Sequence, residues 1–168
     1  MILIAHRGNM NGPNPVEENK PEYLLKAITK GYYVETDLWY VDDKLYLGHD
    51  EPQYEIEIEF LLSIKDKLFC HCKNIKALNY IIENHKEIEC FYHNDDDCVL
   101  TSKNHIWTNI GKELTINSIN VMPERIKASK EQYHNECKLH KLYTDEDIDK
   151  HLIPNKRPTY YGICSDYV

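Results

Sequence analysis

Four titratable side chains in the first fifty residues could form a single site for acid–base and metal chemistry. His6 closes an apolar run and His49 ends a later β-type segment, so both histidines lie at expected strand ends. Glu35 and Asp37 alternate within another apolar segment, and alternate residues of a strand share a face. Carboxylates are hard ligands for Mg²⁺ or Ca²⁺, and imidazoles exchange protons near neutral pH. These residue types and spacings predict metal-assisted acid–base chemistry.

Each signal has a plainer explanation when it is taken alone. A Glu-x-Asp pair is in most proteins a solvated strand face, and a lone histidine is more often a surface or hydrogen-bonded core residue. The setting favours the functional interpretation, because Glu35 and Asp37 lie in an otherwise apolar segment. Two close carboxylates repel there unless a cation or basic group lies between them. His6 and His49 follow apolar β-runs, at the strand ends where parallel α/β folds place their active sites.

Two basic residues could bind the phosphate of a substrate. Arg7 directly follows His6 and presents a fixed positive fork that suits a phosphate, although it could equally pair with Glu18. Lys73 ends another apolar segment and, pointing inward near a carboxylate site, would be a natural phosphate partner.

Alternating strands and helices are predicted for the first half of the chain. Continuous or β-rich runs predict strands at residues 2–5, 32–41, 44–49, 68–73 and 88–93. Helical spacing predicts helices at residues 21–30, 60–67 and 75–85. This order is typical of a parallel α/β fold.

Beyond residue 94 the helical patterns fade. Short strands are predicted at residues 99–101, 105–108, 118–122 and 160–164, and the charged stretch 123–149 has room for one or two short helices that its periodicity does not place. Eight-stranded parallel barrels usually take about 250 residues. With about eight strand candidates in 168 residues, we expect a compact (β/α)8 TIM-type barrel with several outer helices shortened or missing.

The composition indicates one domain over residues 1–168 and excludes several classes of protein. The net charge is −8, with 20 Lys plus Arg against 28 Asp plus Glu, which disfavours a nucleic-acid partner. No apolar run approaches the roughly 20 residues of a membrane span, and His6-Arg7 interrupts the apolar start before a signal-peptide core is complete. The six cysteines show no disulfide framework. We therefore expect a cytoplasmic protein with reduced thiols.

Four short motifs resemble those of the glycerophosphodiester phosphodiesterase family, within the phospholipase C-like phosphodiesterase superfamily. They are His6-Arg7-Gly8, Glu18-Asn19, Glu35-Thr36-Asp37 and His49-Asp50. The family carries His-Arg-Gly, Pro-Glu-Asn-Thr, Glu-x-Asp and His-Asp in this order with similar gaps. The resemblance implies an eight-stranded barrel, a divalent cation on Glu35 and Asp37, His6 and His49 as general acid and base, and supporting roles for Glu18 and Asn19.

The resemblance also identifies one departure from the family pattern. A later family strand ends in Glu-x-Lys, whereas this chain has Cys70-His71-Cys72-Lys73. Lys73 matches, but His71 stands where the third acidic ligand is expected. An imidazole lowers the ligand charge and moves preference from Ca²⁺ towards Mn²⁺ or Zn²⁺. The expected cofactor is one divalent cation, Mg²⁺ or Ca²⁺, with Mn²⁺ as the alternative that His71 introduces. Residues 162–167 are similar to the family's closing strand.

The resulting hypothesis is a metal-dependent phosphodiester hydrolase acting on a small glycerophosphodiester or lysophospholipid-type substrate, with no protein partner indicated. Whether the attacking group is water or a hydroxyl of the substrate stays open. One rival is a catalytically impaired barrel that binds a phosphate ligand. Another is a structural protein in which Glu35 and Asp37 merely pair with Arg7 and Lys73.

For three further features of the sequence, we favour a structural explanation over a functional one. Cys70, Cys90 and their neighbouring histidines lack the spacing of a structural zinc site. Asp95-Asp96-Asp97 is a solvated turn rather than a cation loop. Trp39 and Trp107 could line a substrate pocket, but large aromatic residues in a small domain more often belong to the core.

Overall fold

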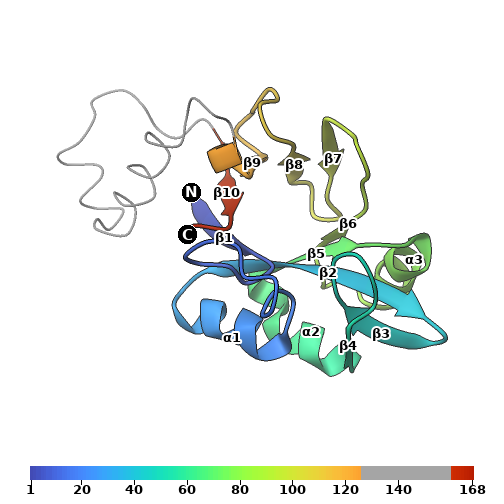
Figure 1. The fold of residues 1–168 in the computed structure, drawn as a ribbon. Helices are drawn as coiled ribbons and strands as arrows, with labels where there is room; N and C mark the ends of the chain where they lie inside the picture. The colour runs from blue at the N-terminus through green and yellow to red at the C-terminus, as the bar shows by residue number, and fades with distance from the viewer. Residues whose placement is uncertain (126–159) are drawn as a thin grey trace, which may run out of the picture.

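The computed structural model describes residues 1–125 and 160–168, in which ten strands form one mixed sheet (Figure 1). The strands are β1 (Ile2–His6), β2 (Tyr33–Val41), β3 (Lys44–Leu47), β4 (Tyr54–Ile56), β5 (Leu68–Cys72), β6 (Cys90–Phe91), β7 (Cys98–Leu100), β8 (Ile106–Thr108), β9 (Ser118–Val121) and β10 (Gly162–Ser165). The helices are α1 (Pro21–Thr29), α2 (Ile58–Ile64) and α3 (Ile75–Asn84), with short 3-10 turns η1 (Lys65–Lys67) and η2 (Pro123–Arg125).

Parallel strands make up the middle of the sheet, in the order β6, β5, β2, β1, β10, β9 and β8. Strand β10, from the end of the chain, lies between β1 and β9 and pairs with both. Strand β7 pairs antiparallel with β8, and β3 and β4 extend antiparallel from the second half of β2. The carboxyl ends of the parallel strands therefore lie at one edge of the sheet.

Alternation along the strands separates two apolar cores. Residues such as Val34 and Leu38 of β2 face the three helices, where they pack with Leu24 and Ile81. The opposite face carries a second cluster on β1, β5, β6, β8, β9 and β10, whose members are Ile4, Phe69, Phe91, Trp107, Ile119, Val121, Met122 and Cys164. The rings of Phe91 and Trp107 lie 4.4 Å apart although their strands do not pair. The sheet is therefore curved around this second core.

The helices form where the sequence supplies their end signals and an apolar stripe. Pro21 stands in the first turn of α1, where its missing N–H costs no hydrogen bond. The Asn74 side chain caps α3 by accepting a hydrogen bond from the backbone N–H of Ala77. Among the described residues, no helix combines the length and apolar character that crossing a membrane requires.

The prediction of a (β/α)8 TIM-type barrel is wrong. The three α-helices of the described residues all precede β6, and no strand pairing there joins β6 to β7 or β8, so the sheet is open at that point. The loop 92–97 joins β6 to β7, and 109–117 joins β8 to β9. Both are shorter than the roughly ten to twelve residues of a helical crossover. These two connections leave no room for crossover helices, so the alternation of strands and helices ends after α3 among the described residues.

Most individual elements were predicted correctly. The three predicted helices and the predicted strands are present, with β6 shorter than expected, the predicted helix 60–67 starting at Ile58 and ending in η1, and β4 not predicted. The charged stretch 123–149 begins with η2, and its remainder lies outside the described residues.

A buried polar cluster ties the two sides of the open edge together. Glu89, immediately before β6, is 6% exposed. Its Oε1 accepts hydrogen bonds from Thr101 Oγ1 and lies against His105 Nδ1, both at 2.6 Å. Because these residues flank the gap between β6 and β8, their side chains, together with the hydrogen bond from the Ser102 N–H to the Cys90 carbonyl, join the sheet where strand pairing is missing.

Glu89→Gln should therefore destabilise the fold. The neutral amide of glutamine cannot replace the charge-assisted hydrogen bonds that the Glu89 carboxylate makes with Thr101 and His105. We therefore expect the free energy of unfolding to fall by about 1–3 kcal/mol. Urea denaturation measures this change. Glu87→Gln, at an exposed neighbouring position, is the control. Equal stability of the two variants would contradict a role for the cluster in closing the edge.

Candidate active site

The pairing of β1, β2 and β5 assembles the candidate metal ligands. His6 lies opposite Glu35 in the β1–β2 pair, and Asp37 lies opposite His71 in the β2–β5 pair. Alternation places Glu35 and Asp37 on the same face of β2, away from the helices. Three adjacent strands thus bring residues that are far apart in the sequence onto one concave surface.

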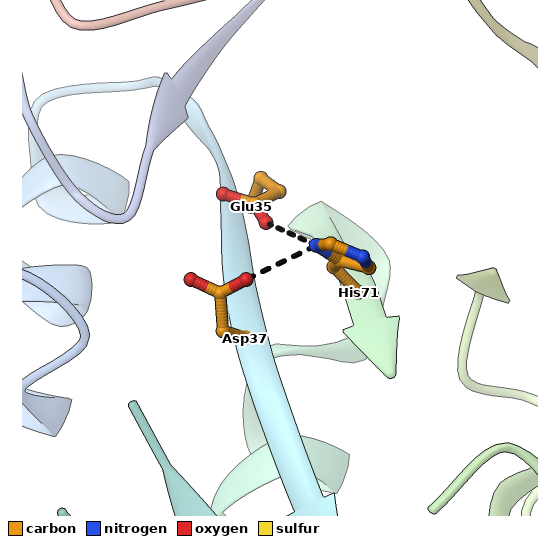
Figure 2. A group of neighbouring side chains, drawn as sticks. All are labelled: Glu35, Asp37 and His71. Carbon is orange, nitrogen blue, oxygen red and sulfur yellow. Dashed lines mark ion pairs between the residues drawn. The ribbon is translucent and has the colours of Figure 1, made fainter. Parts of the chain in front are cut away.

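Glu35, Asp37 and His71 converge as a possible metal site (Figure 2). One ligand atom of each lies within 4.8 Å of the others. His71 Nδ1 is 3.0 Å from Asp37 Oδ1 and 3.8 Å from Glu35 Oε1. The buried Asp37 Oδ1 accepts no hydrogen bond of regular geometry from the described residues. Two carboxylates and one imidazole fit a single divalent cation.

Stacked rings hold the His71 imidazole in place. Phe91 lies nearly parallel to it, with centroids 5.0 Å apart and an interplanar angle of 4°, and His93 stacks at 4.7 Å and 12°. These contacts orient Nδ1 towards the carboxylates before any cation binds. Burial, and then the charge of His71, lowers the pKa of His93, which favours the neutral ring in this stack.

Asp37 is the most densely surrounded carboxylate of the site. Its Oδ2 lies 3.1 Å from Arg7 Nε and 3.2 Å from His49 Nδ1, and Lys73 Nζ is 3.5 Å from Oδ1. Burial alone would raise the pKa of Asp37, but the close polar contacts with His49 and His71 and the charge of Arg7 hold it well below its usual range. Asp37 is therefore ionised.

Glu35 has the opposite electrostatic character. Burial, and then the negative charge of Asp37, raises the pKa of Glu35 above its usual value. Its Oε2 accepts a hydrogen bond from the backbone N–H of Arg7 at 3.1 Å. Arg7 has a φ of +53°, a conformation uncommon for residues other than glycine, so strained backbone aims this donor into the site.

His6 is held by a carboxylate from the other end of the chain. Its Nδ1 lies 2.7 Å from Asp166 Oδ1, and its Nε2 lies 3.9 Å from Glu35 Oε2. Burial disfavours the charged imidazole, but the hydrogen bond with Asp166 and the charge of Glu35 outweigh it, so the pKa of His6 is raised. Burial would raise the pKa of Asp166 too, yet its bond with His6 lowers it.

Asp166 is a site residue to which the sequence prediction gave no role. The signal in the sequence that could have identified Asp166 is the similarity of residues 162–167 to the closing strand of the glycerophosphodiester phosphodiesterase family. Asn9 donates to the same Oδ1 at 2.8 Å, and the Asp166 backbone N–H donates to Glu124 Oε1 at 3.2 Å. These contacts fix the carboxylate, which in turn fixes the ring and tautomer of His6.

Asn19 and Glu18, to which the resemblance assigns supporting roles, contact the charged residues of the site. Asn19 Nδ2 donates to Asp37 Oδ2 at 3.0 Å, and its Oδ1 accepts from Thr36 Oγ1 and from the Asp37 backbone N–H. Glu18 pairs with Arg7 at 3.1 Å. The structure thus brings together all the predicted site residues, namely His6, Arg7, Glu18, Asn19, Glu35, Asp37, His49, His71 and Lys73.

A cavity of about 190 Å³ opens onto this surface. One side is formed by His6, Arg7, Glu35, His49, His71 and His93. The other side is formed by Trp107, Asn109, Ile110, Val121, Met122 and Arg125. Trp107 belongs to the second apolar core, where it packs on Phe69 and Phe91, and it also lines the cavity. Trp39 is not among the lining residues, and its indole N–H donates a hydrogen bond to the Gly48 carbonyl.

Comparisons with known proteins identify no relative of this chain. No model of a known protein family matches the sequence, and a search of curated proteins finds no match.

Asp166→Asn is expected to lower the pKa of His6. The variant removes the charge that opposes the effect of burial, and NMR titration of the His6 imidazole measures the change. In the parent, the pair stabilises the fold between about pH 4 and 6.5, the ordinary values for Asp and His. This stability is lost as the pH rises through the raised pKa of His6 or falls through the lowered pKa of Asp166. The control is Asp66→Asn, at an exposed position, and an unchanged His6 pKa in Asp166→Asn would contradict the pairing.

Proposed function

We propose that this protein hydrolyses small phosphodiesters with the help of one divalent cation, as the resemblance to glycerophosphodiester phosphodiesterases implies. The observation that carries the proposal is the convergence of Glu35, Asp37 and His71 beside a cavity that Glu35, His71, His6 and His49 line. Two carboxylates with an imidazole form a cation site, and two more imidazoles supply proton transfer. A site that served only to hold the fold together would not need both.

The side chains divide the work as follows. Glu35, Asp37 and His71 would hold the cation, which when bound neutralises negative charge on the phosphoryl oxygens. Arg7 and Lys73 lie close enough to Asp37 to share that task on the substrate side.

His6 and His49 exchange protons with the attacking and leaving oxygens. Asp166 orients His6, and Asp37 and Arg7 contact the two nitrogens of His49. The His49 side chain is 37% exposed, whereas that of His6 is 11% exposed. His49 can therefore meet solvent or a departing alcohol at the mouth of the cavity, while His6 works within it.

The size of the cavity supports a small reacting group. About 190 Å³ is less than the roughly 300–1,000 Å³ of sites that enclose drug-sized ligands. A glycerophosphodiester or the head of a lysophospholipid fits such a space, with any acyl chain remaining outside.

The buried free thiols of Cys70, Cys72 and Cys90 support a reducing, cytoplasmic setting.

One observation favours a second candidate, a phosphate-binding module without catalysis. Asp37 is already neutralised by Arg7, Lys73 and His49, and the third carboxylate of the family pattern is replaced by His71. The cluster could therefore persist without a cation.

Cleavage of bis(4-nitrophenyl) phosphate and of glycerophosphocholine with Mg²⁺, Ca²⁺ and Mn²⁺ distinguishes the two candidates. The hydrolase releases nitrophenolate or choline with at least one cation, and chelation stops the reaction. Absence of cleavage with every cation, together with calorimetric binding of inorganic phosphate, would favour the binding module.

A further inference from the structure

The side of the cavity that faces the catalytic residues has its own chemical character. It is built by β8, the loop after it, and the end of β9 with η2. Ile110 at the rim is 38% exposed, while Val121 and Met122 deeper in are almost covered. An aliphatic surface therefore runs from the catalytic side towards the mouth.

Arg125 lines the same cavity as these aliphatic residues. Its side chain is 60% exposed, and the ion contact it makes within the described chain is 3.7 Å, from Nη2 to Asp166 Oδ2. The other pocket-lining guanidinium, Arg7, is 16% exposed and contacts Glu18 through Nη1, Asp37 through Nε and His49 through Nη2. With respect to the described residues, Arg125 therefore has more unengaged donors than Arg7.

A guanidinium with free donors binds planar or tetrahedral oxyanions in a bidentate manner. A ligand whose phosphorus lies beside His6 and Arg7 would meet the aliphatic carbons of Val121 and Met122 and the guanidinium of Arg125 in the same cavity. Such a ligand needs an apolar spacer followed by an anionic group. A cationic end at the same place would be repelled by Arg125.

We propose that the site selects phosphodiesters in which one alcohol carries a short apolar segment ending in a carboxylate or phosphate, with Arg125 as the residue that determines this preference. The inference rests on the proposed function and names the substrate class of the same site. It also disfavours substrates with cationic alcohols such as choline.

Four matched synthetic diesters test the preference. The parent probe is 4-nitrophenyl butyl phosphate, and the others carry a terminal carboxylate, phosphate or trimethylammonium group on the butyl chain. Hydrolysis breaks the P–O bond to the nitrophenyl group, water supplies the new oxygen on phosphorus, and 4-nitrophenolate leaves. We expect kcat/KM for one or both anionic probes to exceed that of the butyl probe about tenfold, with the cationic probe below it.

The substitution Arg125→Gln should bring the ratio of anionic to neutral kcat/KM down to about one, and Arg125→Lys should retain part of it. The matched control for the lost charge is Lys44→Gln, whose Nζ pairs with Glu55 on the exposed β3–β4 hairpin. This control should leave the ratio unchanged. The carboxylate and phosphate probes show which anion fits better.

The outcomes separate this inference from the proposed function. Equal rates across the four probes, or a ratio that survives in Arg125→Gln, would overturn the inference while the hydrolase stands. No hydrolysis of any probe with Mg²⁺, Ca²⁺ or Mn²⁺ would overturn the proposed function and the substrate class with it.

Discussion

His6→Ala and His49→Ala are each expected to lower kcat for phosphodiester cleavage by about 10²- to 10⁴-fold, the usual contribution of a positioned general acid or base. His6 faces Glu35 and Asp166, while His49 faces Asp37 and Arg7. The two rings are supported by different carboxylates, so the roles of acid and base can be divided between them. If one acts as acid and the other as base, each substitution removes one proton transfer and leaves the other.

Steady-state kinetics over a pH range measures this effect. The double variant should lose less than the sum of the single losses in log kcat, since residues that act in one reaction are not additive. The control is His85→Ala, at the end of α3 on the helix-covered side of the sheet. Parent-like kcat in both His6→Ala and His49→Ala would rule out the proposed acid–base pair.

His71→Glu is expected to change the cation preference of the site. An imidazole favours Mn²⁺ or Zn²⁺, whereas a third carboxylate adds charge and a hard oxygen that suit Mg²⁺ and Ca²⁺. We expect the ratio of the Mn²⁺ and Ca²⁺ dissociation constants to shift by at least about tenfold. The substitution also gathers three buried carboxylates, so the cation-free variant should lose roughly 3 kcal/mol of its free energy of unfolding. Added cation should restore most of that loss.

Calorimetry gives the dissociation constants, and thermal melts with chelator or with each cation give the stability. In the parent, electron-spin-echo spectra of bound Mn²⁺ should show coupling to an imidazole nitrogen, and this signal should vanish in His71→Glu. The matched control is His85→Glu, which adds the same charge away from the site. If the parent and His71→Glu bind the cations identically, His71 is not a ligand and the proposed metal site is wrong.

The candidate site was more predictable than the fold. Glu35 and Asp37 share a face because they alternate on one strand, which is a local property of the sequence. The motif spacing also singled out His6, His49 and Arg7. The barrel prediction was wrong because it extended the alternation of the first half to the segments from β6 to β9, whose described connections, residues 92–97 and 109–117, are too short for crossover helices. Strand content was visible there, but the pairing partners were not.

The sequence by itself determined the helices and most strands, the face on which Glu35 and Asp37 lie, and the residue types available for catalysis. Only the tertiary structure decided that His71 lies opposite Asp37, that Asp166 holds His6 from 160 positions away, and that Arg125 borders the same cavity. The physical reason is that periodicity records which face of an element is apolar, whereas contacts between distant segments depend on strand order and register, which are set by packing of the whole chain. The opening fifty residues thus supply the chemistry, and β5, β9 and β10 complete the site around it.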